Sequence, residues 1–176
     1  ELLNRYRPDV VLHAAGSASV GFSFQQPRED FLMAVETWGA VLDAVRRSHG
    51  NPVVVFPSSA AVYGNPDRLP VSEQAPLQPI SPYGFHKVIC EQLAQEYCRC
   101  FGLNVVVTRL FSTVGVYQQR LLVWELFRQA LDEAPYLTLQ GTGDETRDFL
   151  LVDDIVEYIL GISAHQPEGF SVVNMG

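Results

Sequence analysis

The chain has 176 residues, of which 47% are hydrophobic and 18% charged, as is typical of one globular domain. Asp and Glu number 20 against 12 Lys and Arg, which gives a formal net charge of -8. This charge speaks against nucleic acid or an anionic membrane surface as a non-specific partner, and we expect neither. No apolar run reaches the ~18 residues that a membrane-spanning helix needs.

The first half of the chain predicts two strands separated by a helix. Asp9–His13 is a short apolar run that stops at Ala14-Ala15-Gly16, as in a strand covered on both faces of a parallel sheet. Pro27 suits a first helical turn, and Gly50-Asn51-Pro52 suits the end of that helix before a second buried strand at Val53–Phe56. The apolar stripe of the helix comprises Phe31, Val35, Trp38, Leu42 and Val45.

A proline-rich loop from Gly64 to Pro82 precedes the second half, and structureless loops of this length are usually functional. A helix is expected from Tyr83 to Phe101, with Gly102 as its C′ residue. The elements expected after it are a strand at Asn104–Arg109, a polar turn at Ser112–Gln119, a helix at Leu121–Leu131, a short strand at Tyr136–Leu139, a helix from Val152 to about Ser163 and a strand at Phe170–Val173.

Strands and helices alternate throughout, which predicts an α/β fold with a mostly parallel sheet and right-handed crossovers. Ligands bind beyond the carboxyl ends of the strands in such sheets. Three segments follow strand ends and should meet at this rim: Ala14-Ala15-Gly16, Ser58-Ser59 and Leu110-Phe111-Ser112. The small residues of the first segment would let a flat ligand approach the backbone.

Ser59, Tyr83 and Lys87 form the pattern with the most chemical content. On a helix, Tyr83 and Lys87 would lie on one face, about 5–6 Å apart at Cβ. An ammonium beside a phenol favours the phenolate, which can take a proton from a sugar hydroxyl near neutral pH. Taken singly, the residues also suit a half-buried tyrosine beside a solvated lysine, and a strand-end serine bonded to backbone. The three together, in this order, favour the catalytic interpretation.

Five segments between Pro8 and Ile155 are specific as a set: PDVVLHAAG, PSSAAVYG, SPYGFHK, VVVTRLFSTVG and GTGDETRDFLLVDDI. Together they resemble the extended short-chain dehydrogenases/reductases, the family of nucleotide-sugar epimerases and dehydratases. The resemblance implies a Rossmann-like, doubly wound sheet. It also implies the cofactor NAD, with NADP left open, and a nucleotide-diphosphate sugar as the substrate.

The resemblance implies a role for each residue at the rim. Tyr83 would be the catalytic base, Lys87 would bond the nicotinamide ribose hydroxyls, and Ser59 would bond the same substrate oxygen as Tyr83. Working at pH 7 requires the pKa of Tyr83 to fall by roughly 3 units, and Lys87 would supply part of that field. Cofactor-binding residues would be Ala14, Ala15, Gly16, Ser58, Tyr83, Lys87 and Phe111. Substrate-binding residues would be Ser59, Tyr83, Ser112 and Arg147.

Arg147 corresponds, by this resemblance, to the arginine that grips the substrate's diphosphate through a bidentate contact. The alternative is an ion pair with Asp144, Glu145 or Asp148. Asp153-Asp154 suits a helix N-terminus, where acidic residues interact favourably with the helix dipole, so we expect no metal site there.

The chain also departs from the family pattern. Gly16 and Gly21 do not reproduce the spacing of the glycine-rich dinucleotide fingerprint. We therefore expect residues 1–176 to be one α/β domain and an internal fragment, without the first βαβ unit and the C-terminal end, so that the chain alone need not bind NAD. Glu36 and Ser112 stand where the family usually has asparagines that contact the cofactor and a phosphate.

The two residues after Ser59 distinguish among the reactions of the family. Sugar 4,6-dehydratases have an Asp-Glu pair there to eliminate water, whereas this chain has Ala60-Ala61, whose methyl groups do no acid/base chemistry. The segment instead resembles UDP-glucose 4-epimerases, so we expect NAD-dependent epimerisation at carbon 4 through a transient 4-keto sugar. A 4-ketoreductase and a non-catalytic cofactor- or nucleotide-sugar-binding remnant are the alternatives.

Two further expectations concern the setting and the assembly. Cys90, Cys98 and Cys100 lack zinc-site spacing, so we expect buried reduced thiols and a cytoplasmic protein. Relatives form dimers through the equivalents of the two long helices, which implies a homodimer. Trp38 or Phe101 would lie in that interface, or alternatively in the core.

Overall fold

A four-stranded parallel sheet in the order β1-β2-β3-β6 forms the centre of the computed structural model, which describes residues 1–132, 136–139 and 141–176. The prediction of an α/β fold with a parallel, Rossmann-like sheet is confirmed. β2 and β3 pair over their whole lengths, from Val53 opposite Asn104 to Ser59 opposite Leu110. The strands are β1 (Val10–Leu12), β2 (Val53–Ser59), β3 (Asn104–Leu110) and β6 (Phe170–Met175).

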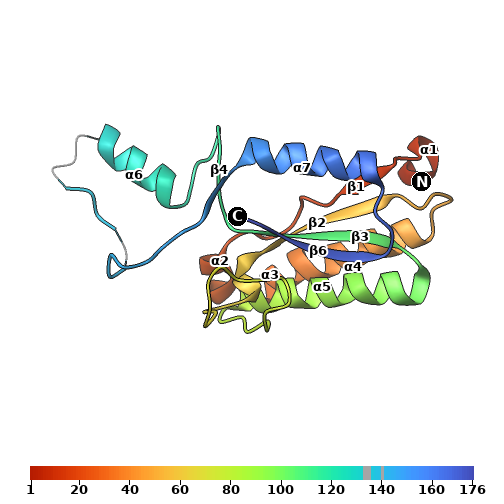
Figure 1. Ribbon diagram of the computed structural model, residues 1–176, viewed down its shortest axis with the longest axis horizontal. Helices are drawn as coiled ribbons and strands as arrows, with labels where there is room; N and C mark the ends of the chain where they lie inside the picture. Colours follow the sequence, from red (N-terminus) through yellow and green to blue (C-terminus); the bar gives the residue numbers. More distant parts are fainter. Residues whose placement is uncertain (133–135, 140) are drawn as a thin grey trace.

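Helices cover both faces of this sheet, with α4 and α5 along one face and α7 along the other (Figure 1). Short helices precede α4, and a π-helical segment, η1, joins them to it. The helical segments are α1 (Leu2–Tyr6), α2 (Val20–Gln25), α3 (Pro27–Phe31), η1 (Leu32–Glu36), α4 (Thr37–Arg46), the 3₁₀ turn η2 (Ala60–Val62), α5 (Pro82–Phe101), α6 (Leu122–Leu131) and α7 (Val152–His165).

Two apolar clusters explain why the central strands are apolar on both faces. Alternate residues of a strand point to opposite faces, so neighbouring valines serve different clusters. The larger cluster, between the sheet and α4–α5, contains Trp38, Leu42, Val45, Val54, Phe56, Cys90, Ala94, Val105 and Val107. The smaller one, under α7, contains Val53, Val55, Val106 and Ile162. The helical stripe predicted from Phe31 to Val45 therefore faces the core, with Phe31 partly buried against it.

The helix boundaries follow local signals in the sequence. Pro27 begins α3, as its fixed φ favours, and Gly102 ends α5 in the left-handed region at φ 72°. Ser81 caps α5, because its hydroxyl oxygen accepts a hydrogen bond from the Gly84 amide at 3.1 Å. These ends agree with the predicted ones to within a residue.

The structure differs from the sequence-based prediction at several short elements. Ser112–Val114, expected to be a turn, forms strand β4, which pairs in parallel with β5 (Phe149–Leu151). Helix α2 was not predicted either. The strand expected at Tyr136–Leu139 is wrong, since residues 136–139 form none and Thr138 instead bonds the Gln129 side chain through its backbone. Three-residue strands carry no period, and only their distant partners define them.

The cysteines only partly match the expected burial. Cys90, Cys98 and Cys100 are all free thiols; Cys90 is buried, Cys98 is half-buried and Cys100 is exposed, so the expectation is wrong for Cys100. Within the described ranges, no helix is both long enough and apolar enough to cross a membrane.

Candidate active site

The end of β2 and the first turn of α5 place Ser59 beside Tyr83. Ser59 ends β2, and its hydroxyl oxygen accepts a hydrogen bond from the Ala61 amide at 3.2 Å. Gly84 allows α5 to pack against η2, because a Cβ at this position would lie 2.6 Å from the Ala61 carbonyl oxygen. This close approach brings the phenol of Tyr83 into a hydrogen bond with the Ser59 side chain.

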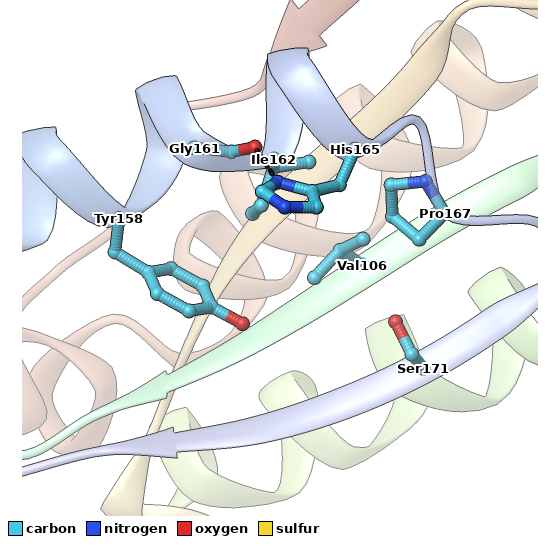
Figure 2. A pocket seen from close by; sticks show the side chains of 7 residues that line it. All are labelled: Val106, Tyr158, Gly161, Ile162, His165, Pro167 and Ser171. Atoms are coloured by element: carbon cyan, nitrogen blue, oxygen red, sulfur yellow. Dashed lines mark hydrogen bonds between the residues drawn. The ribbon is translucent and has the colours of Figure 1, made fainter.

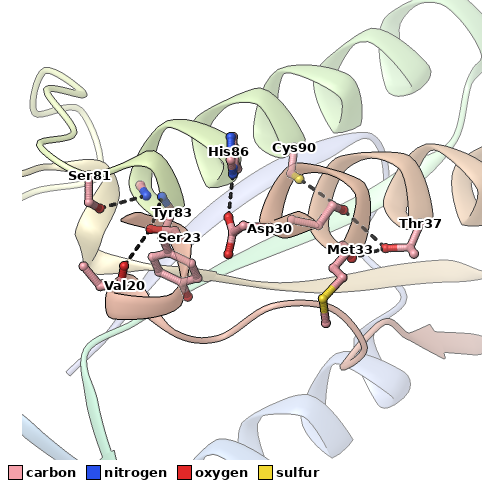
Figure 3. Close-up of polar contacts among 11 residues, drawn as sticks. Val20, Ser23, Asp30, Met33, Thr37, Ser81, Tyr83, His86 and Cys90 are labelled. Carbon is pink, nitrogen blue, oxygen red and sulfur yellow. Dashed lines mark hydrogen bonds and ion pairs between the residues drawn. The ribbon is translucent and has the colours of Figure 1, made fainter. Parts of the chain in front are cut away.

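Tyr83 is held from a second side by α2, as Figure 3 shows. The buried Ser23 accepts a hydrogen bond from the Tyr83 amide at 3.1 Å and donates its own proton to the Val20 carbonyl at 2.7 Å. Ser23 therefore fixes the backbone of the tyrosine, while Ser59 bonds its phenol. Sequence patterns did not indicate Ser23, since its role depends on a contact 60 residues away.

The electrostatics of Tyr83 differ from the prediction. Burial raises the pKa of the phenol, the hydrogen bond from Ser59 lowers it, and the negative charge of Asp30 raises it further. The net direction is upward, whereas sequence reasoning expected Lys87 to bring the pKa down. The physical reason is that the phenol sits in a desolvated position, where a phenolate is unfavourable until positive charge is added.

Lys87 lies on the same face of α5 as Tyr83, as the spacing predicts. Its ammonium is 5.6 Å from the centre of the Tyr83 ring and 4.7 Å from that of Phe56. It donates a hydrogen bond to the Pro57 carbonyl oxygen at 2.9 Å. The residue is only 9% exposed, and burial lowers the pKa of the amine. The solvated-lysine alternative is therefore wrong.

An aromatic layer lies under Lys87. The Phe56 ring stacks on Trp38 with centroids 4.5 Å apart, and the His13 ring is 5.2 Å from Trp38. Burial, together with the charge of Lys87, lowers the pKa of His13, which favours the neutral imidazole. Phe56 and Trp38 carry no charge and His13 favours its neutral form, so Lys87 is the positive group above this layer.

Beside this layer, Arg109 and Glu91 form a buried ion pair that sequence reasoning missed. Arg109 donates to both carboxylate oxygens of Glu91, from Nη2 at 2.7 Å and from Nε at 3.1 Å. The Ser58 hydroxyl donates to the same carboxylate at 2.6 Å. That hydroxyl is therefore committed to Glu91, and the cofactor contact predicted for Ser58 is left to its backbone. Arg109 follows the apolar run Val105–Val107 in the sequence, and a charged residue in a buried strand indicates a buried partner of opposite charge.

The same arginine anchors the proline-rich loop. Arg109 Nη1 donates to the Tyr63 hydroxyl at 2.6 Å and to the Glu73 carbonyl oxygen at 3.0 Å. Glu73 in turn accepts from the Asn174 amide at 3.0 Å, and Asn174 donates to the Val71 carbonyl oxygen at 2.9 Å. The loop is thus fastened to the ends of β3 and β6, next to the rim that carries Ser59.

The segment after β1 has the shape that a flat cofactor needs. Ala14, Ala15 and Gly16 are exposed, and Gly16 adopts φ 115°, with the Met33 carbonyl 2.9 Å from where a Cβ would be. A side chain there would strike the π-helical segment. The Lys87 ammonium has three N–H groups. It donates one to the Pro57 carbonyl oxygen, which leaves donors for the two hydroxyls of a ribose. These residues fit the nicotinamide–ribose half of NAD.

The predicted substrate residues lie beyond the end of β3. Phe111 and Ser112 follow it directly and bond the Met175 and Asp148 carbonyl oxygens through their amides, both at 3.0 Å. Arg147 is exposed shortly before β5, the strand that pairs with β4. Its guanidinium donates to the Thr146 carbonyl oxygen at 2.7 Å.

The alternative for Arg147, an ion pair with a neighbouring carboxylate, is not found within the described part of the chain. Glu145 instead accepts hydrogen bonds from the Thr142 and Gly143 amides, and these bonds lower its pKa to about 2. Arg147 is therefore available to an anionic ligand. Among the residues that the structure describes, no cluster of His, Cys, Asp or Glu could hold a metal ion.

A separate cavity of about 360 Å³ lies between α7 and the strands β3 and β6 (Figure 2). Its walls are mostly apolar, and none of the predicted site residues lines it. Val106 and Ser171 place it in the first half of their strands, away from the rim where Ser59 lies. The cavity is therefore separate from the rim that carries the predicted catalytic residues.

Comparisons with known proteins agree with this geometry. A sequence model of the NAD dependent epimerase/dehydratase family matches residues 1–176. The UDP-glucose 4-epimerase of Azospirillum brasilense is 33% identical over 177 residues, which cover 89% of this chain and 51% of that protein. The chain spans about half the length of such relatives.

Two solved structures share the fold. The UDP-glucuronic acid 4-epimerase from Bacillus cereus, in complex with UDP-glucuronic acid and NAD, has a TM-score of 0.90 and 28% identity, over 99% of this chain and 55% of that one. A dTDP-glucose 4,6-dehydratase double mutant from Streptomyces venezuelae, with NAD bound, has a TM-score of 0.88 and 28% identity, over 99% and 55% of the two chains. Epimerases and dehydratases thus match about equally well.

Proposed function

The chain belongs to the NAD dependent epimerase/dehydratase family, and on that premise we propose that it carries the catalytic residues of an enzyme that epimerises a nucleotide sugar at carbon 4. The proposal rests on Ser59, Tyr83 and Lys87 at one rim, with Ala60-Ala61 between the serine and the tyrosine. Its substrate is a nucleotide-diphosphate sugar, whose diphosphate Arg147 would bind.

Each residue has a defined task in this reaction. Tyr83 takes the proton from the hydroxyl at carbon 4 as a hydride leaves the same carbon, and a ketone forms there. Ser59 donates a hydrogen bond to that oxygen throughout. After the 4-keto sugar rotates in the site, the hydride returns to the opposite face of carbon 4. Tyr83 then gives the proton back to the oxygen on that carbon. Bound NAD supplies the hydride acceptor and donor, together with positive charge near the phenol.

Lys87 has two tasks, to bind the cofactor and to stabilise the ionised form of the base. Its remaining N–H groups are suited to the ribose hydroxyls of the nicotinamide half, and its charge favours the phenolate of Tyr83. Because burial raises the pKa of Tyr83, the base functions only when the ammonium and the bound cofactor act together.

Ala60 and Ala61 support epimerisation over dehydration. They form η2 directly after Ser59, and the Ala61 carbonyl contacts the first turn of α5. Elimination of water needs an acid and a base at the sugar, and methyl groups supply neither. The shared fold alone does not distinguish the two reactions, so these two side chains carry the assignment.

The test is turnover of the full-length protein with NAD and UDP-glucose, followed by chromatography of the sugar products. Tyr83→Phe should lower turnover about 10²–10⁴-fold, since it removes the proton acceptor. Tyr97→Phe, at a half-buried tyrosine on the same helix, is the matched control and should retain turnover. Retained turnover in Tyr83→Phe would contradict the proposal. Net consumption of NADPH would favour a ketoreductase, and cofactor binding without any turnover a binding module.

We also propose a homodimer formed through the outer faces of α4 and α5, in a reducing, cytoplasmic setting. Phe101 is 49% exposed at the end of α5, with the Arg46 guanidinium 5.2 Å from its ring centre. Trp38 has no exposed surface, so it belongs to the core and cannot contribute to such an interface. The free thiols of α5 fit a reducing setting.

A further inference from the structure

Lys87 is a buried ammonium without a direct carboxylate partner. The residue is 9% exposed, and no ion pair joins it to an acidic side chain in the part of the chain that the structure describes. Its hydrogen bond goes to a neutral group, the Pro57 carbonyl oxygen, at 2.9 Å. Burial without a direct counter-charge disfavours the protonated amine. A neutral source of negative potential next to the ammonium would offset part of that cost.

The ring of Phe56 lies where such a source is needed. The Lys87 ammonium is over this ring, 4.7 Å from its centre. A cation within about 6 Å of a ring centre is attracted by the negative face of the ring. Phe56 directly precedes Pro57 in β2, so two consecutive residues of one strand contact the ammonium, one with its ring and the other with its carbonyl oxygen. The Tyr83 ring is farther away, at 5.6 Å.

The Phe56 ring is itself held in place. It is 2% exposed and stacks on Trp38, with centroids 4.5 Å apart and an angle of 27° between the ring planes. Trp38 has no exposed surface, and its indole N–H donates to the Cys90 carbonyl oxygen at 2.9 Å. Cys90 belongs to α5, so the stack is bound to the same helix that carries Lys87. The face that Phe56 presents to the ammonium is therefore fixed by the core.

We propose that Phe56 is a positioning residue, whose ring holds the Lys87 ammonium charged and in place through a cation–π contact. A ring face attracts the charge as a whole, whereas a carboxylate in its place would accept the N–H groups. The contact thus stabilises the ammonium and leaves its remaining donors to the ribose hydroxyls. Only this use of the donors rests on the proposed function.

Removing the negative face of the ring should make the charged form of Lys87 less favourable and lower its pKa. The titratable and charged groups around Lys87 are Tyr83, Cys90 and Glu91 from α5, Asp30 from α3, His13 after β1, and Arg109 from β3, which is paired with Glu91. None of them is altered by a substitution at Phe56. A change in the titration of Lys87 would therefore report the ring.

The experiment measures the ionisation of Lys87 in the full-length protein without NAD or a sugar. In protein labelled with ¹³C-lysine, the Cε resonance of Lys87 is the one that disappears in Lys87→Arg, however many lysines the protein has. Phe56→Leu replaces the ring with an apolar side chain and should lower the titration midpoint by about 0.5–1 pH unit. Phe31→Leu is the matched control, because this ring packs against the same core but contacts His86, and it should keep the wild-type midpoint.

A midpoint in Phe56→Leu equal to that in Phe31→Leu would overturn the proposal, as would a rise. If Phe56→Leu does not fold, fluorinated phenylalanines in place of Phe56 provide the second measurement. Each added fluorine weakens the negative face while the ring keeps its shape, so the midpoint should fall in steps from one fluorine to three. An equal midpoint across this series would refute the contact. Because neither measurement uses turnover, failure of the proposed epimerase function leaves both intact.

Discussion

Ser59, Tyr83 and Lys87 are the residues for which the sequence was most informative. Their order and spacing predicted one rim and one helix face, and the structure places Tyr83 in a hydrogen bond with Ser59 and near the Lys87 ammonium. The pKa of Tyr83 could not be predicted in the same way. The direction in which the pKa of Tyr83 shifts depends on how far solvent is excluded from the phenol and on the charge of Asp30, which belongs to another helix.

Cys90 gives a prediction about stability at alkaline pH. Burial raises the pKa of its thiol from 9.0 to about 12 in the folded chain. The unfolded chain releases this proton above pH 9, whereas the folded chain retains it. The stability linked to this thiol is therefore fully present below pH 9 and is lost as pH rises towards 12. At pH 10 the loss should be about 1 kcal/mol.

The measurement is the free energy of unfolding in urea at pH 8 and pH 10. Cys90→Ala should lose less stability between the two pH values than the wild type does, whatever its absolute stability. Cys100→Ala, at an exposed thiol of the same helix, is the control and should keep the wild-type difference. An unchanged difference in Cys90→Ala would show that this thiol is not the cause.

At the scale of elements, the contact between η2 and α5 decides the geometry of the site. The sequence motif contains a glycine after the tyrosine, but its purpose is visible only in space. Gly84 sits against the Ala61 carbonyl and the Pro79 side chain, with 2.6 and 2.9 Å to the place of a Cβ. Two segments separated by the whole proline-rich loop meet there.

Gly84→Ala should therefore push the first turn of α5 away from η2. We expect the free energy of unfolding to fall by about 1–3 kcal/mol, because the contact is with backbone that has to shift. Turnover, where it is measured, should fall as well, since Tyr83 moves relative to Ser59. Chemical denaturation and the turnover assay measure the two effects.

Gly161→Ala in α7 is the matched control for that substitution. Nothing lies within 4 Å of a Cβ at Gly161, so a helix-interior alanine should stabilise the chain by about 0.5–1 kcal/mol. Equal stability changes of the same sign in both variants would contradict the close contact at Gly84.

At the scale of the whole molecule, the layers of the fold determine which surfaces remain for partners. α7 covers one face of the sheet and α4–α5 the other, so the outer faces of α4 and α5 are open to a second copy of the chain (Figure 1). Phe101 is the exposed aromatic residue that the sequence singled out on this layer. Trp38, the other candidate, is turned inwards and donates a hydrogen bond to the Cys90 carbonyl oxygen at 2.9 Å.

The homodimer can be checked by sedimentation velocity. The full-length protein should sediment as a dimer, and Phe101→Asp should shift it towards the monomer by placing a charge in an apolar interface. Tyr117→Asp, at a 93% exposed aromatic residue after β4, should leave the dimer intact. A wild-type protein that sediments as a monomer would refute the interface.

The sequence by itself determined the long elements and the chemical type of the rim. Helical stripes, capping residues and buried strand runs are local patterns, and the residues after each strand end fall at one edge in any parallel sheet. The tertiary structure alone decided the rest: the pairing of β4 with β5, the Arg109–Glu91 pair, the anchoring of the proline-rich loop, and the bond between Asp30 and His86. These depend on contacts between distant residues and on solvent exclusion, neither of which has a local signature in the sequence.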